Sequence, residues 1–294
     1  MAQQEFLLGV DGGGTQCRAR LADRFGAVLG DGLAGPANIR RGLSDSIAAI
    51  MDAARQGLAA AGLREDAFAR TTACLALAGA SEPDDLAAAR QCPLPFRRTL
   101  IVTDAEAACI GAHAGEDGGI VIVGTGSIGW ASRGGRQCRV GGWGLPVSDE
   151  GSGAWLGLEA IRRALWAADG RIARTAFLSR LLDQFEGDPH AIVRWAANAT
   201  PADYGRLAPI VAEFATRGDP VAADLMRESA GHIAALARCL FASDAPRLSL
   251  VGGLSAALEP YMPEDIRRRL APPKGDGLSG ALRLAAAEAA EAAR

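Results

Sequence analysis

The pattern of apolar and polar positions divides the first 115 residues into strands and helices. Continuous or alternating apolar runs predict strands, whereas apolar residues spaced three and four apart predict helices. The predicted elements are strands at 6–10, 18–22 and 27–29, a helix at 44–61 with a serine at its N-cap, a strand at 72–77, a helix at 84–90, a strand at 100–102 and a helix at 105–112. Three successive strands followed by alternating helices and strands indicate an α/β domain.

The pattern beyond this point starts in a similar way and then becomes mainly helical. A strand is predicted at 120–123, after the turn sequence "GEDGG", and helices dominate from Ser152 to Phe241. A strand at 248–251 precedes an alanine-rich helix that begins near Ser279. The segment "HAGEDGG" therefore predicts a boundary between an N-terminal domain, 1–115, and a C-terminal domain, 116–294.

The two predicted domains open with the same plan. "FLLGVDGGGTQCRARLADRFGAVL" and "GIVIVGTGSIGWASRGGRQCRVG" each contain an apolar strand, a glycine-rich turn that carries a threonine, a second strand, a polar turn and a third strand. Backbone N–H groups in such turns can bind an anion, and glycine lets phosphate oxygens approach without a Cβ in the way. The repeat therefore predicts two turns that bind phosphate.

Other interpretations of the glycine turns are possible. "GTGSIG" at 124–129 satisfies the dinucleotide pattern G-x-G-x-x-G, with Asp149 at a suitable distance, but that fold needs a helix next. "WASRGGRQCRVGG" instead predicts a hairpin that turns at Gly134 and Gly135. No P-loop pattern is present. Tight hairpin turns without a ligand remain an alternative, although they explain one such turn better than two matching ones.

Composition narrows the class of partner. The chain has 294 residues, 49% of them hydrophobic, and a formal net charge of -3, which favours two globular domains without a basic surface for nucleic acid. Its six cysteines form no C-x-x-C pair, and neither a signal-peptide pattern nor an apolar run of membrane-spanning length is present. We therefore expect a cytoplasmic protein with reduced thiols, a small-molecule partner and no membrane or nucleic-acid partner.

Several motifs, in order, resemble those of a known superfamily. "LGVDGGGTQCRARL", "IVIVGTGSIG" and "LSLVGGLS" are similar to the phosphate 1, phosphate 2 and adenosine motifs of the actin, sugar kinase and Hsp70 superfamily. "GPAN", "VTDAEAACIGAH" and "GGWGLPVSDEGSGAWLG" resemble the BadF/BadG/BcrA/BcrD ATPase-like family, in the branch of N-acetylglucosamine and bacterial glucosamine kinases. The resemblance implies two ribonuclease-H-like (actin-like ATPase) domains that flank a nucleotide and sugar cleft. A homodimer would also fit.

The resemblance implies that ATP and Mg²⁺ are the cofactors and assigns a nucleotide role to each glycine turn. Asp11 would hold Mg²⁺ through water. Backbone groups of the two turns would surround the phosphates, and the glycines of the adenosine motif would let adenine lie against the main chain. The residues expected to bind the nucleotide are Asp11, Gly12, Gly13, Gly14, Thr15, Gly124, Thr125, Gly126, Gly252 and Gly253.

The same resemblance assigns the sugar and the catalytic base. Asp104 matches the aspartate that takes the proton from the sugar 6-hydroxyl, and the residues expected near the sugar are Asn38, Asp104, Thr125, Gly126, Asp149 and Glu150. Three of these residues have a simpler alternative. Asp104 could cap the helix that follows it, Asn38 could support the turn after Pro36, and Asp149 could cap the helix that "DEGSG" introduces.

The implied activity is transfer of the ATP γ-phosphate to the 6-hydroxyl of D-glucosamine. N-acetyl-D-glucosamine 6-kinase activity is the first alternative, and a sugar-responsive protein that binds ATP without turnover is the second. An activase of a radical dehydratase has a related fold, but it needs closely spaced cysteine ligands for an iron–sulfur cluster, and the sequence lacks them.

Overall fold

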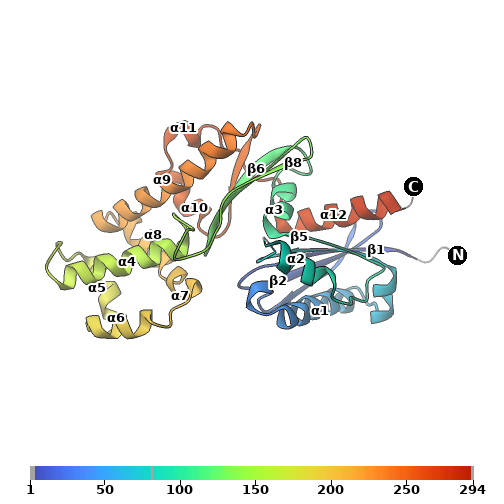
Figure 1. Cartoon of the computed structure of the whole chain (residues 1–294), viewed down its shortest axis with the longest axis horizontal. Coiled ribbons are helices and arrows are strands. Elements are labelled where there is room, and N and C mark those ends of the chain that lie inside the picture. Colours follow the sequence, from blue (N-terminus) through green and yellow to red (C-terminus); the bar gives the residue numbers. More distant parts are fainter. Residues whose placement is uncertain (1–3, 81, 293–294) are drawn as a thin grey trace. The chain divides into compact units, whose positions relative to one another are not determined.

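The protein folds into two compact units, as seen in a computed structural model that describes residues 4–80 and 82–292. Unit 1 runs as far as Asp117 and also includes the segment from Pro273 onward, and unit 2 is Gly118–Pro272. Each unit contains one β-sheet with helices against it (Figure 1). The α/β class predicted from the sequence is confirmed.

The sheet of unit 1 has five strands in the order β3-β2-β1-β4-β5. The strands are β1 (Phe6–Gly12), β2 (Cys17–Asp23), β3 (Val28–Ala34), β4 (Thr71–Leu77) and β5 (Arg98–Thr103). β1 pairs antiparallel with β2 and parallel with β4, and β4 pairs parallel with β5. The carboxyl ends of β1, β4 and β5 therefore lie at one edge of the sheet.

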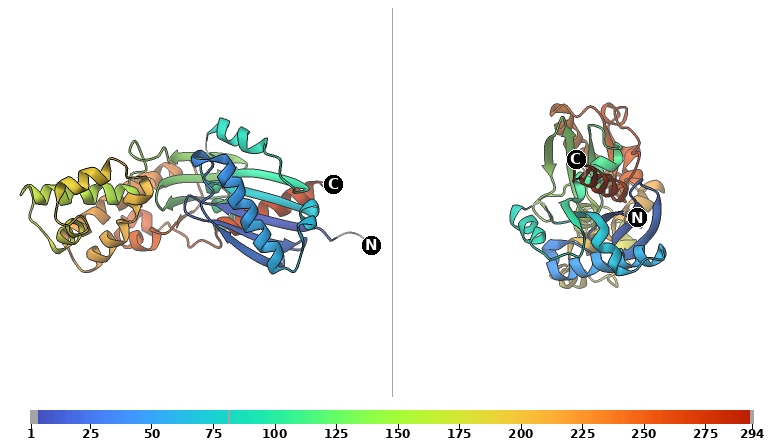
Figure 2. Two further views of the ribbon diagram at one scale, coloured as in Figure 1. Left: turned by 90° about the horizontal axis from the view of Figure 1, so that it is seen from below. Right: turned by 90° about the vertical axis from the view of Figure 1, so that its right-hand side faces the viewer.

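Helices cover both faces of this sheet. α1 (Leu43–Ala60) packs against β2 and β3, and α12 (Gly277–Ala292) packs against β1, β4 and α3 (Asp104–Ala112). Side chains alternate between the faces: Leu8 belongs to the apolar cluster beneath α1, and its neighbour Leu7 to the cluster beneath α12. Figures 1 and 2 show α1 and α12 on opposite faces. α2 (Pro83–Arg90) and the short 3₁₀ helices Ile39–Arg41 and Glu65–Arg70 complete the unit.

The sheet of unit 2 repeats this plan with one strand fewer. Its order is β8-β7-β6-β9, with strands β6 (Gly118–Val123), β7 (Ser127–Arg133), β8 (Arg136–Gly141) and β9 (Leu248–Val251). β6 is antiparallel to β7 and parallel to β9, as β1 is to β2 and β4. β7 and β8 form a hairpin that turns at Gly134 and Gly135. The predicted hairpin is confirmed, and no dinucleotide-binding helix follows the glycines.

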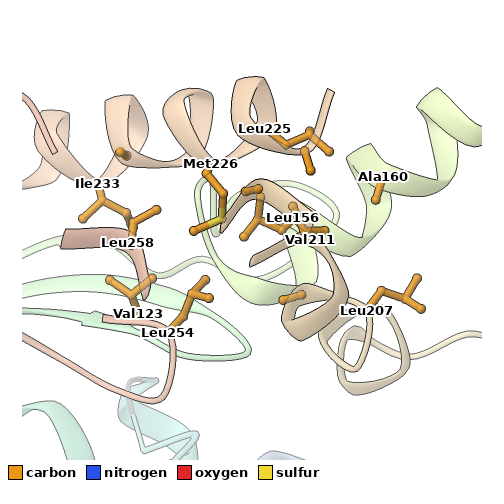
Figure 3. Packing of buried hydrophobic residues seen from close by; sticks show 14 of the residues in the cluster. Val123, Leu156, Ala160, Leu207, Val211, Leu225, Met226, Ile233, Leu254 and Leu258 are labelled. Carbon is orange, nitrogen blue, oxygen red and sulfur yellow. The ribbon is translucent and has the colours of Figure 1, made fainter. Parts of the chain in front are cut away.

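Helices of unit 2 build a large apolar core against one face of the sheet. They are α4 (Gly153–Ala168), α5 (Ala176–Asp183), α6 (Pro189–Ala196), α7 (Pro201–Gly205), α8 (Ala208–Thr216), α9 (Pro220–Ala242), α10 (Ser255–Leu258) and α11 (Glu264–Arg267), with a 3₁₀ turn at Glu259–Tyr261. Figure 3 shows Leu156 of α4, Met226 and Ile233 of α9, and Val123 of β6 meeting in this core.

Two sequence-based expectations require correction. The boundary after residue 115 is close to the end of the first segment of unit 1, but the expected domain 116–294 is wrong at its C-terminal end. α12 belongs to unit 1 because it packs on β1, β4 and α3. The helix expected at 44–61 begins at Leu43, and its N-cap is Gly42, with no side-chain cap, rather than a serine. The first helical hydrogen bond runs from Ser46 N–H to the carbonyl of Gly42.

The cysteines are free thiols, as expected. Burial raises the pKa of Cys17 and Cys74 to about 12, with a further contribution from the neighbouring carboxylates of Asp11 and Glu106 respectively. These two side chains therefore stay protonated and act as small apolar groups. Within the described part of the chain, no helix is long and apolar enough to cross a membrane.

The contact between α12 and α3 leaves no room for a side chain at Gly280. A Cβ there would lie 1.8 Å from the carbonyl oxygen of Ala107, a backbone atom. We therefore predict that Gly280→Ala lowers the free energy of unfolding by about 2 kcal/mol or more, as overpacking does. Gly231 of α9 is the matched control, because a Cβ there meets nothing within 4 Å.

Gly231→Ala should be neutral or stabilising by up to about 1 kcal/mol, since alanine favours helix. Urea unfolding of the two variants, followed by circular dichroism, makes the comparison. Equal effects of the two substitutions would mean that α12 does not pack on α3 as described.

Candidate active site

The parallel strands of unit 1 bring the predicted site residues to one edge of the sheet. Gly12 of β1 is in register with Leu77 of β4, and Leu77 with Thr103 of β5. The residues that follow these three, Gly13 and Asp104 among them, therefore leave the sheet at the same edge. The expected phosphate turn and the expected catalytic aspartate are thus neighbours by topology, although they are far apart in sequence.

The turn between β1 and β2 is closed by its own backbone. Gly13 N–H donates to the carbonyl of Gln16 at 2.9 Å, and Gly14, Thr15 and Gln16 are exposed. Gly12 is buried, and a Cβ there would lie 2.9 Å from the Leu77 side chain. Gly12 is therefore required by packing, whereas the exposed backbone of Gly14 and Thr15 is available to an anion.

Asn38 lies beside this turn, and the oxygen of its side-chain amide already accepts a hydrogen bond within the protein. Its Oδ1 accepts from Arg40 N–H at 3.1 Å and caps the 3₁₀ turn at Ile39–Arg41. Asn38 therefore does support the local turn, as the alternative from the sequence expected. The Nδ2 atom lies on the side of the phosphate turn, 4.0 Å from where a Cβ of Gly14 would be. A ligand at this turn would meet an amide donor.

Asp104 is the first residue of α3 and not its N-cap. Thr103 is the cap, because its Oγ1 accepts from Glu106 N–H at 3.1 Å. The Asp104 Oδ1 accepts from Ala105 N–H at 2.9 Å, and the residue is only partly buried. Because Thr103 caps the helix, capping does not explain why an aspartate stands at position 104.

Asp11 takes part in an ion-pair chain. Arg18, its partner in the β1–β2 register, donates to the Asp11 Oδ2 at 2.5 Å and to the Asp276 Oδ2 at 2.8 Å. No group of three or more His, Cys, Asp or Glu able to hold a metal ion occurs among residues 4–80 and 82–292. One carboxylate beside an exposed glycine turn fits Mg²⁺, which keeps several waters and takes phosphate oxygens as its other ligands.

The turn between β6 and β7 in unit 2 is held by the start of α4. Gly124 N–H donates to the Gly126 carbonyl at 2.9 Å, and the N–H groups of Gly153 and Ala154 donate to the carbonyls of Gly124 and Thr125 at 2.8 and 3.0 Å. Thr125 itself is exposed. The turn carbonyls are therefore occupied by the helix, which fixes the conformation that a ligand would meet.

Asp149 lies against this turn. A Cβ on Gly126 would be 2.5 Å from the Asp149 Oδ2, and the Oδ1 accepts from Gly144 N–H at 3.1 Å. Asp149 has a positive φ of 65°, an uncommon conformation for a residue other than glycine. Burial raises the pKa of its carboxyl group against the opposing hydrogen bond from Gly144. Ser152 caps α4, so the capping role considered for Asp149 is not found.

Two serine hydroxyls anchor the loop of Asp149 and Glu150. Ser127 of β7 donates to the Glu150 carbonyl at 2.9 Å, and the fully buried Ser229 of α9 donates to the Gly151 carbonyl at 2.7 Å. Sequence analysis missed Ser229, because it lies 78 residues from the loop in a helix with no motif around it. Arg18 and Asp276 were also missed, although Arg18 stands within the phosphate 1 motif.

The adenosine motif reaches the same edge of its sheet as the turn after β6, because β9 is parallel to β6. Gly252 has a φ of 100°, and a Cβ there would lie 2.5 Å from the Val123 carbonyl oxygen. Leu254 N–H donates to that carbonyl at 3.0 Å. Gly253 is exposed, with no atom within 4 Å of its Cβ position. Gly252 is thus structural, and Gly253 is open to a ligand.

The predicted residues therefore form two groups. Unit 1 brings together Asp11, the first glycine turn, Asn38 and Asp104, and unit 2 brings together the second glycine turn, Asp149, Glu150 and the adenosine motif.

Comparisons with known proteins agree with this geometry. The chain is 37% identical over 280 residues to glucosamine kinase GspK of Vibrio cholerae serotype O1, covering 95% of both chains. It is 28% identical over 234 residues to an N-acetylmuramic acid/N-acetylglucosamine kinase of Clostridium acetobutylicum, covering 77% of this chain and 76% of that one.

Solved structures share the fold. A candidate N-acetylglucosamine kinase from Chromobacterium violaceum superposes with a TM-score of 0.91 at 37% identity, over 96% of this chain and 99% of that one. A ROK family glucokinase from Streptomyces griseus, solved with glucose and AMPPNP, gives a TM-score of 0.59 at 21% identity, over 95% and 98% of the chains, and supports the fold alone.

The family model that matches covers residues 8–285, from the first phosphate motif into the last helix. Both glycine turns and the adenosine motif lie inside that range, and the chain belongs to the BadF/BadG/BcrA/BcrD ATPase family.

Proposed function

We propose that the protein is a sugar kinase that transfers the γ-phosphate of ATP to the 6-hydroxyl of D-glucosamine. The observation that carries the proposal is the 37% identity with a glucosamine kinase over 95% of both chains. The position of Asp104, at the same sheet edge as the first phosphate turn, supports it. A phosphoryl-transfer enzyme needs phosphate-binding backbone and a carboxylate that orients or deprotonates the acceptor, and unit 1 offers both.

We assign residues to phosphate binding, adenosine binding, metal binding and proton acceptance. Exposed backbone of the turns after β1 and β6 binds the phosphates, and the open glycine at 253 admits the adenosine. Mg²⁺, when bound, neutralises charge that develops on the phosphate oxygens. Asp11 is the residue that would hold it, through water. Asp104 accepts the proton of the 6-hydroxyl as that oxygen bonds to the γ-phosphorus, while the bond from the γ-phosphorus to the β-phosphate oxygen breaks and ADP leaves.

The groups proposed to contact the sugar are each fixed by hydrogen bonds within their own unit. Asn38 Nδ2 is a donor beside the first turn, and Asp149 is an acceptor fixed by Gly144 and anchored through the neighbouring loop. Thr125, Gly126 and Glu150 complete the set. We place the protein in the cytoplasm, where ATP is supplied, and keep the homodimer as a proposal that the sequence resemblance suggested.

N-acetyl-D-glucosamine is the second candidate acceptor. The Clostridium relative is named for N-acetylmuramic acid and N-acetylglucosamine, and the Chromobacterium structure for N-acetylglucosamine. The choice depends on whether the groups near the sugar C2 position accept an ammonium or an acetamide. A protein that binds sugar and ATP without turnover is the remaining alternative.

The substrate is tested by measuring ADP release with a panel of sugars. Purified protein with MgATP is given glucosamine, N-acetylglucosamine, glucose or N-acetylmuramic acid. We expect glucosamine to have the highest kcat/KM. A higher kcat/KM for N-acetylglucosamine would move the assignment to the second candidate, and ATP binding without ADP release for any sugar would identify a non-catalytic protein.

The role of Asp104 is tested with Asp104→Asn. Thr103 keeps the cap of α3, so stability should be close to that of the wild type, while kcat should fall by roughly 10²- to 10⁴-fold because the amide cannot accept the proton. Asp84→Asn is the matched control, since Asp84 is an exposed aspartate in the first turn of α2. Near-normal turnover of Asp104→Asn at saturating substrates would show that another group is the base.

Phosphate binding by the second turn is tested with Gly124→Ala. A Cβ at Gly124 meets no protein atom within 4 Å, so the substitution should leave the Tm unchanged. The added methyl group would occupy space that phosphate must approach, and we expect ATP affinity, measured by calorimetry, to fall about tenfold or more. Gly126→Ala is less informative because its Cβ would collide with Asp149. Unchanged ATP affinity in Gly124→Ala would argue against a phosphate at this turn.

A further inference from the structure

One guanidinium joins two carboxylates from opposite ends of the chain. Arg18 of β2 faces Asp11 across the β1–β2 ladder and donates through Nη2 to its Oδ2 at 2.5 Å. Its Nη1 donates to the Oδ2 of Asp276, just before α12, at 2.8 Å. The side chains of Asp11, Arg18 and Asp276 are 22%, 35% and 50% exposed, so an ion in solution can reach this chain of charges.

The two carboxylate oxygens of Asp276 have different partners. Its Oδ1 accepts from Ser279 N–H at 3.0 Å, and the Ser279 Oγ accepts from Asp276 N–H at 2.9 Å, so the pair caps the start of α12. The Oδ2 is left to Arg18. The helix cap therefore fixes where the second partner of Arg18 stands, and an asparagine would keep the cap without the charge.

The first residue of α12 is a glycine whose missing side chain would point at Asp11. A Cβ on Gly277 would lie 3.4 Å from the Asp11 Cγ and Oδ2. No side chain of Gly277 thus stands between the helix N-terminus and the carboxylate. The cap of α12, Arg18 and Asp11 are thereby joined in one contact group within unit 1.

A guanidinium and a divalent cation compete for the same carboxylate. A cation that approaches Asp11 meets an oxygen already paired with Arg18, and repulsion between the two positive charges disfavours their both staying there. Asp276 offers Arg18 a second anionic partner at hydrogen-bond distance. The cost of separating Arg18 from Asp11 therefore depends on the charge of Asp276.

We propose that Asp276 is a positioning residue for the metal site, which holds Arg18 away from Asp11 when Mg²⁺ binds. The proposal rests on the proposed function in one respect, namely that Asp11 is the carboxylate that holds the ion. Asp276 acts through Arg18 and does not itself contact the ion. Arg18 serves as the cation of the site when the metal is absent.

The test measures metal affinity directly. Binding of Mn²⁺ in the presence of saturating ADP is followed by electron paramagnetic resonance for the wild type, Asp276→Asn, Arg18→Met and the double variant. Asp276→Asn leaves Arg18 with Asp11 alone, and Mn²⁺ affinity should fall about two- to fivefold, the scale of a partly exposed ion pair. Arg18→Met removes the competitor, and affinity should rise by a similar factor.

The double variant decides whether Asp276 acts through Arg18. Its Mn²⁺ affinity should equal that of Arg18→Met, since without the guanidinium the charge of Asp276 has no ion-pair partner through which to act. ADP affinity in EDTA and the Tm are measured for Asp276→Asn, and both should stay close to the wild type because the cap of α12 is kept. Equal metal affinity of Asp276→Asn and the wild type would overturn the proposal.

Two further outcomes would also overturn it. If Arg18→Met does not raise Mn²⁺ affinity, Arg18 does not compete with the metal for Asp11. If the double variant is weaker than Arg18→Met, Asp276 acts on the ion by itself. Failure of the proposed function is distinguishable, because it appears as wild-type protein that turns over no sugar, whereas the order of the four Mn²⁺ affinities does not depend on a sugar.

Discussion

Parallel pairing of strands is the constraint on which the candidate site depends. β1, β4 and β5 run in one direction, and Gly12, Leu77 and Thr103 occupy one row across them. The first glycine turn and Asp104 must then leave the sheet at one edge. In unit 2 the parallel pairing of β6 with β9 places Gly252, which follows β9, beside Val123 at the end of β6. Its φ of 100° and the nearby Val123 carbonyl leave no room for a side chain. Each sheet thus gathers residues that are distant in sequence.

The glycines of the motifs do two different things that sequence alone does not separate. Gly12 and Gly252 are needed because protein atoms fill the Cβ position, whereas at Gly124 and Gly253 that position is open. Neither open position has a positive φ, so neither packing nor backbone conformation requires glycine there, and glycines that leave room for a nucleotide are consistent with the proposed function. The nucleotide hypothesis is therefore tested best at Gly124 and Gly253, whereas Gly12 and Gly252, whose Cβ positions are blocked by protein atoms, shape the turns.

Much of the fold could be predicted from the sequence, because strands, glycine turns and their order are local patterns; the roles of the candidate site residues stay predictions. The predicted strand at 248–251 matches β9 residue for residue, and the hairpin at Gly134 and Gly135 follows from turn chemistry. The unit to which α12 belongs could not be predicted, since an alanine-rich helix can cover either sheet. Ser229 and Asp276 were missed for a similar reason: each acts on a residue distant in sequence, through a contact that only folding creates.

The central claim is that phosphate is transferred from ATP to the 6-hydroxyl of an amino sugar. Proton-coupled ³¹P nuclear magnetic resonance of the product formed from glucosamine and MgATP tests it directly, since the splitting of the phosphorus signal counts the protons on the esterified carbon. The account predicts a sugar phosphate signal split by the two protons of the C6 methylene group. A signal split by a single proton would place the phosphate on a ring carbon, and formation of inorganic phosphate alone would show hydrolysis without transfer; either result would contradict the account.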